Sequence, residues 1–248
     1  MIRVALIGAA GRMGQAISRA VENPADVQIA AQIEVGDALD DDSLHDCDVV
    51  IDFSHAEATE RNCAAAARTG KPLVIGTTGQ SREQSKFIGD AAGKIPVVLA
   101  SNFSVGVNAL FWLTRKASEL LGENFDLEIV ETHHRLKKDA PSGTAKRLAQ
   151  ILCEERGLNF EADVAHGREG LVGERPATQI GMHAIRAGDV VGDHTVIFAA
   201  PGERLELSHK ASSRETFAVG ALRAARWIIG QPAGLYDMED VLGLSEHT

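Results

Sequence analysis

The 248-residue sequence is 44% hydrophobic and 24% charged, the balance of an ordinary soluble globular protein. Aspartates and glutamates number 35 against 25 lysines and arginines, which gives a formal net charge of −10. This charge argues against a protein that binds nucleic acid or anionic membranes, because its long-range field has the wrong sign.

Two further features bear on the compartment. The amino terminus enters an apolar run directly, and no stretch approaches the roughly 20 apolar residues that span a bilayer, so we expect a cytoplasmic protein. The cysteines Cys47, Cys63 and Cys153 are an odd number without metal-ligand spacing. We therefore expect them to be reduced and structural, and we predict no metal site.

A predicted strand over residues 2–7 ends in the turn Gly8-Ala9-Ala10-Gly11-Arg12-Met13-Gly14, which leads into a predicted helix. This order is typical of a dinucleotide-binding fold, because glycines let the backbone approach a pyrophosphate that lies on the helix amino terminus. Ala10 replaces the second glycine of the common fingerprint. The spacing alone is therefore a weak signal, and the alternative is a tight turn that only packs a helix on a strand.

A second predicted strand, over residues 27–33, ends at Glu34, 20 residues after Gly14. A carboxylate at this position accepts hydrogen bonds from the adenosine ribose hydroxyls and repels a 2′-phosphate. Val35 follows, and no arginine or lysine appears before Arg61, so the local sequence predicts NADH as the preferred cofactor and leaves NADPH as a possible one. The alternative is an exposed carboxylate at the end of a strand.

Strands and helices then alternate along the chain. Strands are predicted at 49–53, 72–75 and 97–100, with helices at 56–68 and about 83–92. This order predicts a doubly wound parallel sheet of the Rossmann type, in which ligands bind beyond the carboxyl ends of the strands. That edge would carry Gly8, Asp52-Phe53, Gly76-Thr77-Thr78 and Ser101-Asn102, although each could instead be only a turn.

The pattern changes after Phe103. A helix at about 107–121, a strand at 126–132 and a helix ending near Gly157 come before a glycine-rich segment, 165–176, which we interpret as a mobile loop. Strands follow at 179–186, 193–199 and 204–208. They predict an α+β domain with a four-stranded mixed sheet that buries one face against helices, so the other face suggests sheet-to-sheet oligomerisation.

The last part of the chain, a helix over 214–229 and the segment 234–242, is expected to return to the first domain. The predicted domains are therefore a dinucleotide-binding domain of residues 1–104 and 215–248, and a substrate-binding and oligomerisation domain of residues 105–214.

A basic stretch, His133-His134-Arg135-Leu136-Lys137-Lys138, stands out in this acidic protein. It is followed by Ser142-Gly143-Thr144, where Ser142 is the expected N-cap of a helix. Free amides at a helix start bind carboxylate or phosphate oxygens, and histidines carry protons near neutral pH. On charge alone, a solvated basic loop is the alternative.

Several motifs in chain order resemble the dihydrodipicolinate reductase (4-hydroxy-tetrahydrodipicolinate reductase) family. They are Gly11-Arg12-Met13-Gly14, Ile75-Gly76-Thr77-Thr78-Gly79, Asn102-Phe103-Ser104-Val105-Gly106-Val107-Asn108, residues 133–144, Arg186-Ala187-Gly188-Asp189, His209-Lys210-Ala211-Ser212-Ser213-Arg214 and Gly234-Leu235-Tyr236-Asp237-Met238. The resemblance implies reduction of 4-hydroxy-tetrahydrodipicolinate to tetrahydrodipicolinate by NAD(P)H in lysine and diaminopimelate biosynthesis. It also implies a homotetramer built through the second sheet.

The resemblance also implies residue roles. His133 is the implied proton donor and Lys137 assists it. The implied substrate contacts are His134, Ser142, Gly143 and Thr144. The implied cofactor contacts are Gly8, Ala9, Ala10, Gly11, Arg12, Met13, Glu34, Gly76, Thr77, Thr78, Ser101, Asn102 and Phe103. Arg135 and Lys138 are expected to face solvent or to be structural.

This sequence departs from the family at the adenine end of the cofactor site. The connection from Glu34 to Asp48 is short, and no arginine follows Glu34, a residue that supports NADPH use in some members. Two other functions are weighed against the reductase. An aspartate-semialdehyde or homoserine enzyme lacks support because no cysteine is placed as a nucleophile. A non-catalytic nucleotide-binding redox sensor of the same fold predicts loss of the proton donor, yet His133 and Lys137 are present.

Overall fold

The computed structural model describes residues 1–21 and 26–245, and the chain divides into two compact units. Unit 1 comprises Met1–Val105 and Arg214–Thr248, and unit 2 comprises Gly106–Ser213. None of the helices in the described ranges has the length and apolar character needed to cross a membrane.

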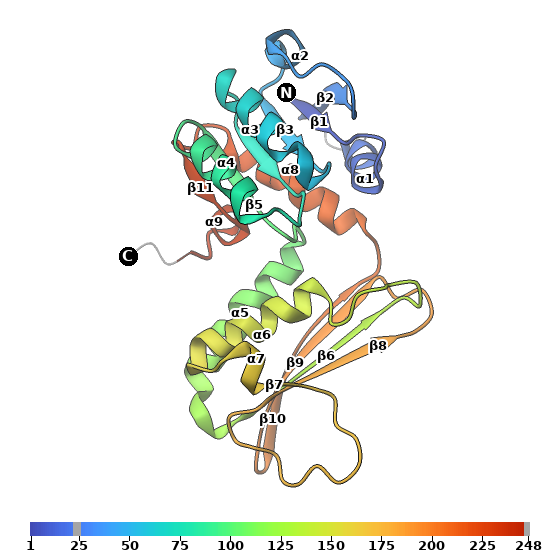
Figure 1. The fold of residues 1–248 in the computed structure, drawn as a ribbon, viewed down its shortest axis with the longest axis vertical. Helices are drawn as coiled ribbons and strands as arrows, with labels where there is room; N and C mark the ends of the chain where they lie inside the picture. The colour runs from blue at the N-terminus through green and yellow to red at the C-terminus, as the bar shows by residue number, and fades with distance from the viewer. Residues whose placement is uncertain (22–25, 246–248) are drawn as a thin grey trace. The chain divides into compact units, whose positions relative to one another are not determined.

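Unit 1 is built on a six-stranded sheet in which every paired strand is parallel to its neighbour (Figure 1). Its strands, in spatial order, are β11 (Gly234–Tyr236), β5 (Pro96–Leu99), β4 (Leu73–Ile75), β3 (Val49–Asp52), β1 (Ile2–Ile7) and β2 (Val27–Ile33). The predicted doubly wound parallel sheet is confirmed. The return of the last part of the chain is also confirmed, because β11 pairs with β5.

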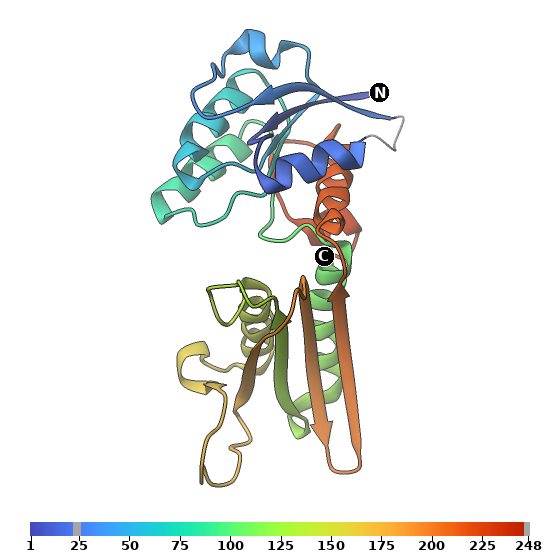
Figure 2. The same ribbon diagram turned by 90° about the vertical axis from the view of Figure 1, so that its right-hand side faces the viewer.

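Helices cover both faces of this sheet (Figure 2). They are α1 (Arg12–Val21), α2 (Asp41–His45), α3 (Thr59–Arg68), α4 (Arg82–Ala92), α8 (Glu215–Ile228) and α9 (Met238–Leu242), with a 3-10 turn, η1 (Ala56–Ala58). Alternate residues of β1 enter separate cores: Val4 and Leu6 pack with α1 and α8, whereas Ala5 and Ile7 pack with α3 and α4. Burial on both faces explains why the central strands β3 and β4 are fully buried runs, whereas the edge strand β2 includes exposed residues.

Unit 2 contains a mixed sheet with helices on one face (Figure 1). Its elements are α5 (Val105–Leu121), η2 (Gly122–Asn124), β6 (Asp126–His133), α6 (Gly143–Arg156), α7 (Phe160–Asp163), β7 (Val164–His166), β8 (Ile180–Arg186), β9 (Gly192–Ala200) and β10 (Glu203–Ala211). The strand order is β10-β9-β6-β8-β7, with β6, β7 and β8 mutually parallel and β9 antiparallel to both neighbours.

The sheet of unit 2 has five strands, so the predicted number of four was wrong. The additional strand is β7, whose residues Val164–His166 pair in parallel with β8. It overlaps the start of the segment that the sequence assigns to a loop, because three residues before a glycine are too few to show strand periodicity.

Strand β6 has two different faces. Leu127, Ile129, Glu131 and His133 are buried on the side that α5 and α6 cover, whereas the residues between them are half-buried on the other side. The last two buried positions of β6 therefore place ionisable groups at the end of an apolar row. These two groups begin the candidate site of unit 2.

Candidate functional site

The turn after β1 brings the backbone of unit 1 close to the end of β3. Gly8 has φ +80°, and a Cβ added there would lie 2.5 Å from the Phe53 carbonyl oxygen. A Cβ at Gly14 would collide with Gly8 and Ala9. Glycine is therefore required at both positions, and the turn leaves no side-chain bulk between the backbone and a ligand, as a pyrophosphate cradle needs.

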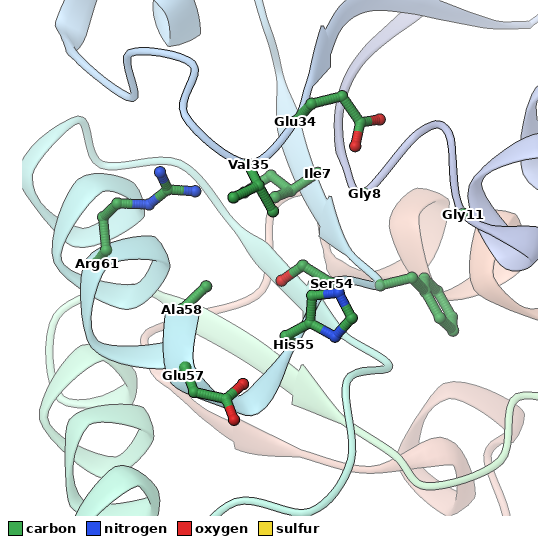
Figure 3. Close-up of a pocket in the computed structure, with 11 residues that line it drawn as sticks. Ile7, Gly8, Gly11, Glu34, Val35, Ser54, His55, Glu57, Ala58 and Arg61 are labelled. Carbon is green, nitrogen blue, oxygen red and sulfur yellow. The ribbon is translucent and has the colours of Figure 1, made fainter.

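A cavity of about 450 Å³ opens beside this turn (Figure 3). Among the predicted cofactor residues, the structure brings Gly8, Gly11 and Glu34 together in its lining. The Glu34 carboxylate accepts a hydrogen bond from the Ala10 amide at 2.5 Å and points toward the glycine turn. The size of the cavity, the glycine cradle and the carboxylate fit the adenosine half of a nicotinamide cofactor.

The lining also contains residues that sequence reasoning missed. They follow β3 and are Ser54, His55, Glu57, Ala58 and Arg61. Because β3 is the direct neighbour of β1, the carboxyl-edge rule could have identified the segment after Phe53. The local sequence offers no cation between Glu34 and Arg61, but α3 brings Arg61 itself, 27 residues further along the chain, to the wall of the cavity that Glu34 lines.

A buried carboxylate fixes the loops at this edge. Asp52, at the end of β3, is 1% exposed. Its Oδ1 accepts hydrogen bonds from Ser54 N at 2.9 Å and Thr77 Oγ1 at 3.1 Å, and its Oδ2 accepts one from Asn62 Nδ2 at 2.9 Å. One side chain thus joins the ends of β3 and β4 to α3, which holds the cavity wall before any ligand arrives.

The other predicted cofactor residues lie at the same sheet edge but outside the cavity lining. The Phe53 ring packs closely over Gly76 and lies 5.5 Å from the Phe103 ring, so these three residues form one apolar contact. Asn102 accepts a hydrogen bond from Ser104 N. Ala9 and Thr77 are buried, Met13 is half-buried, and Ala10, Arg12, Thr78 and Ser101 are exposed.

In unit 2, the centre of the site is Glu131, which is fully buried. Its Oε2 accepts a hydrogen bond from His133 Nδ1 at 2.5 Å, and Arg186 donates to both carboxylate oxygens at 2.8 Å. Its Oε1 also accepts the Ser142 amide at 3.1 Å. Strands β6 and β8 and the start of α6 therefore meet at one carboxylate.

These contacts shift the pKa values of Glu131 and His133. Burial alone would raise the pKa of Glu131, but hydrogen bonds from Arg186, His133 and Ser142 outweigh it and lower that pKa. Burial lowers the pKa of His133; Glu131 opposes this shift, and the positive charges of Lys137 and Arg186 add to it. Glu131 is therefore an anion that holds His133 Nδ1 as a donor, which leaves Nε2 as the ring nitrogen that is not bound to Glu131.

A second buried histidine lies beside the first. The rings of His133 and His194 are 5.2 Å apart in an edge-on arrangement, and His194 Nε2 is 2.9 Å from Ser142 Oγ. Burial and the nearby His133 lower the pKa of His194 to about 4. Ser142 also accepts the Ala145 amide through Oγ, so its predicted role as the N-cap is confirmed.

The remaining residues of the basic stretch surround this centre. Lys137 pairs with Asp139 at 3.0 Å, and Arg186 also binds the Asp139 carbonyl, which ties the loop after β6 to β8. His134 is half-buried, and its Nδ1 has no partner among the described residues. Gly143 is exposed and Thr144 half-buried at the start of α6, whereas Arg135 and Lys138 are exposed.

The structure thus brings His133, Ser142 and, through its charge, Lys137 into one site. Sequence reasoning missed Glu131, Arg186 and His194. Glu131 could have been found from the sequence, because it lies two residues before His133 and therefore on the same face of a strand. Arg186 and His194 become neighbours only through the pairing of β6 with β8 and β9.

Comparison with known proteins points to one family. Models described as dihydrodipicolinate reductase, N-terminus and C-terminus, match residues 2–103 and 106–242. The chain is 58% identical over 246 residues to the 4-hydroxy-tetrahydrodipicolinate reductase of Akkermansia muciniphila, covering 99% of this chain and all of that protein. It is 47% identical over 266 residues to the enzyme of that name from Hahella chejuensis, covering 98% and 100%.

A solved structure gives the same result. Dipicolinate-bound dihydrodipicolinate reductase from Paenisporosarcina sp. TG-14 superposes with a TM-score of 0.78 at 25% sequence identity. The match covers 96% of this chain and 97% of that one.

Proposed function

The chain belongs to the dihydrodipicolinate reductase family, and from this premise we propose how its residues perform the reaction. It is an oxidoreductase of lysine and diaminopimelate biosynthesis that reduces 4-hydroxy-tetrahydrodipicolinate to tetrahydrodipicolinate with a nicotinamide cofactor. The observation that carries the proposal is the attachment of buried Glu131 to His133, Arg186 and the Ser142 amide.

Unit 1 holds the cofactor, which supplies a hydride when bound. The glycine turn receives the pyrophosphate, Glu34 accepts the adenosine ribose hydroxyls, and Phe53, Gly76 and Phe103 form the apolar floor at the strand ends. The remaining predicted cofactor residues contribute backbone and side-chain contacts along the same edge. NADH is the preferred cofactor, since Glu34 repels a 2′-phosphate.

Unit 2 supplies the proton. Hydride addition to C4 of a conjugated cyclic imine builds electron density that a positioned acid quenches. His133 donates this proton from Nε2, because its Nδ1 is held by Glu131. The space beside Nε2 is kept open by Gly192, where an added Cβ would lie 3.0 Å from that nitrogen. Lys137 assists by placing a positive charge near the reacting ring.

The substrate carries two carboxylates, so two anion sites are needed. The start of α6, at Ser142, Gly143 and Thr144, supplies amides and the positive end of the helix dipole. His134 and Lys137 supply cationic or donor side chains. The Nδ1 of His134, which has no partner among the described residues, can donate a hydrogen bond to a substrate oxygen when it carries a proton.

The reaction is tested by a coupled assay in which the upstream synthase makes the substrate and loss of reduced cofactor is followed. His133→Ala is expected to lower kcat by roughly a hundredfold to ten-thousandfold, the usual contribution of a general acid. Lys138→Ala, an exposed cation of the same stretch, is the matched control and should keep wild-type kcat. Cofactor binding without turnover by the wild type would instead favour the non-catalytic sensor.

Cofactor preference is tested with the same assay. A higher kcat/KM with NADH than with NADPH is expected, and equal values would contradict the proposed role of Glu34. Substrate contacts are tested with dipicolinate, a planar dicarboxylate, which should bind the wild type tightly and His134→Ala or Thr144→Ala weakly.

We further propose a cytoplasmic homotetramer joined through the open face of the unit 2 sheet. Its support is the half-exposed row opposite the helices, where Ile185 is 46% exposed. Cys47, Cys63 and Cys153 are all free and buried, which supports a reducing compartment. Light scattering of the purified protein measures the oligomer directly.

A further inference from the structure

Arg61 lies in the wall of the unit 1 cavity, on the side opposite the glycine turn. It is the third residue of α3, and the cavity lining also contains Glu34 and Val35. Figure 3 shows its guanidinium directed toward Val35, whereas the Glu34 carboxylate is directed toward Gly8 and Gly11. The cation and the carboxylate therefore border the same space without neutralising each other.

The Arg61 guanidinium is available for a ligand. Its Nε donates to Asn62 Oδ1 at 3.3 Å, and neither Nη atom has a hydrogen bond or ion pair among the described residues. Glu57, one turn earlier, directs its carboxylate away from Arg61 (Figure 3). By contrast, Arg68 on the same helix is paired with Asp41 at 2.7 Å and binds the Leu39 carbonyl.

The other residues that line the cavity indicate which ligand group the Arg61 guanidinium would bind. Glu34 accounts for the ribose hydroxyls of adenosine, so a phosphate on the 2′ oxygen extends into the space beside Glu34. Val35 offers no charge there, and Arg61 is the one arginine or lysine among the residues that line this cavity in the described part of the chain. A guanidinium with two unpaired Nη groups matches a phosphate in a bidentate fashion.

We propose that Arg61 binds the 2′-phosphate of NADPH and is the residue that makes NADPH a usable second cofactor. The inference rests on the proposed function, in which unit 1 holds the adenosine end of a nicotinamide cofactor. Arg61 offsets the repulsion from Glu34 and so sets the ratio of the two cofactor affinities. It has no such effect on NADH, which lacks the phosphate.

The test is equilibrium binding without substrate, measured by fluorescence titration with NADPH and NADH. Arg61→Ala is expected to raise the Kd of NADPH by roughly tenfold to a hundredfold and to change that of NADH by less than about twofold. Calorimetry with adenosine 2′,5′-bisphosphate and adenosine 5′-monophosphate should give the same contrast. Arg61→Lys should recover part of the NADPH affinity, and Arg68→Ala is the matched control that changes neither.

Three results would overturn the inference. An equal loss for both cofactors would place Arg61 on the adenine ring or in the wall of the cavity. No loss for either would remove it from the site. An Arg68→Ala loss equal to that of Arg61→Ala would show a general charge effect. Turnover of the wild type with NADH tests the proposed reductase function independently. If the wild type turns over with NADH but Arg61→Ala does not weaken NADPH binding selectively, only the inference about Arg61 is rejected.

Discussion

At the scale of single residues, the site depends on a carboxylate that has no contact with water. A buried anion is costly unless every lone pair finds a donor. Glu131 meets this requirement through His133, through both Nη groups of Arg186 and through the Ser142 amide. The same bonds that stabilise the charge also orient His133, the proton donor that we propose, so one side chain serves both the fold and the proposed reaction.

The pH profile of kcat/KM tests this orienting role. His133 must be protonated to act, so kcat/KM falls as the pH rises through its lowered pKa. Glu131→Gln removes the group that opposes the lowering and leaves burial, Lys137 and Arg186, so the fall should begin at a lower pH. Glu206→Gln, an exposed carboxylate of β10, is the control. An identical profile in Glu131→Gln would contradict the role, whatever its effect on kcat.

His194 should make the folded state sensitive to acid. Its pKa is about 4 when folded and 6.5 ordinarily, so between these values the unfolded chain binds a proton that the folded chain does not. The free energy of unfolding therefore falls as the pH drops from 6.5 to 4, by up to about 3 kcal/mol. The free energy of unfolding, measured by urea titration at several pH values in this range, should depend less steeply on pH for His194→Gln than for the wild type. An equal dependence on pH in both proteins would mean that His194 is not buried in its neutral form.

Residue-scale reasoning from the sequence succeeded where chemistry is local. The basic stretch and the serine before the helix both mark the site in unit 2, and Ser142 is the N-cap as predicted. Glu131, Arg186 and His194 could not be assigned as a group, because their proximity comes from strand register rather than from sequence spacing. Arg61 could not be assigned to the cofactor site either, because only the fold brings it to the cavity that Glu34 lines.

At the scale of elements, two arginines attach the segment between β7 and β8 to Glu128 on the open face of β6, and a histidine of β8 contacts the same carboxylate. Arg168 donates to both Glu128 oxygens at 2.7 and 3.1 Å, and Arg175 Nε donates to Oε1 at 3.1 Å. His183 is 2.7 Å from Oε2. Burial would raise the pKa of Glu128, but these bonds lower it to about 2.

Gly181 provides the space for this carboxylate, since an added Cβ would collide with the Glu128 side chain. Gly181→Ala should displace Glu128 and break its bonds to Arg168 and Arg175, so limited proteolysis should cut residues 167–179 faster than in the wild type. Gly202→Ala is not a suitable control, because Gly202 has φ +89°; Gly89→Ala has open space and an ordinary φ. Unchanged cleavage in Gly181→Ala would show that the arginines do not hold the segment.

Element boundaries followed the sequence where periodicity runs long. Strands β1 to β5 of unit 1 and the helices α5, α6 and α8 lie within a few residues of the predicted ranges. The elements that were not predicted are short: β7 and β11 have three residues each and take their strand geometry from their neighbours β8 and β5, and α7 has four residues. The length of a pattern, more than its composition, decided what could be predicted.

At the scale of the whole molecule, the open face of the unit 2 sheet predicts how copies associate. Ile185 lies on that face beside Thr132, whereas Leu205, 39% exposed, lies on the helix side beside Phe198. Ile185→Glu should place repelling charges in a sheet-to-sheet contact and lower the mass measured by light scattering. Leu205→Glu is the matched control. Tetramers from both variants would exclude this face as the interface.

The division of unit 1 between the two ends of the chain has a consequence for synthesis. Ala218, Ala221, Leu222 and Ile228 of α8 close the core that Val4 and Leu6 begin. On the ribosome, residues 1–105 therefore emerge with one sheet face covered by α1 but not by α8, while unit 2 is continuous and can close first. Nascent chains stalled after residue 213 has emerged should protect 106–213 from protease and leave 1–105 open to it. Equal protection would show that the first 105 residues fold without α8.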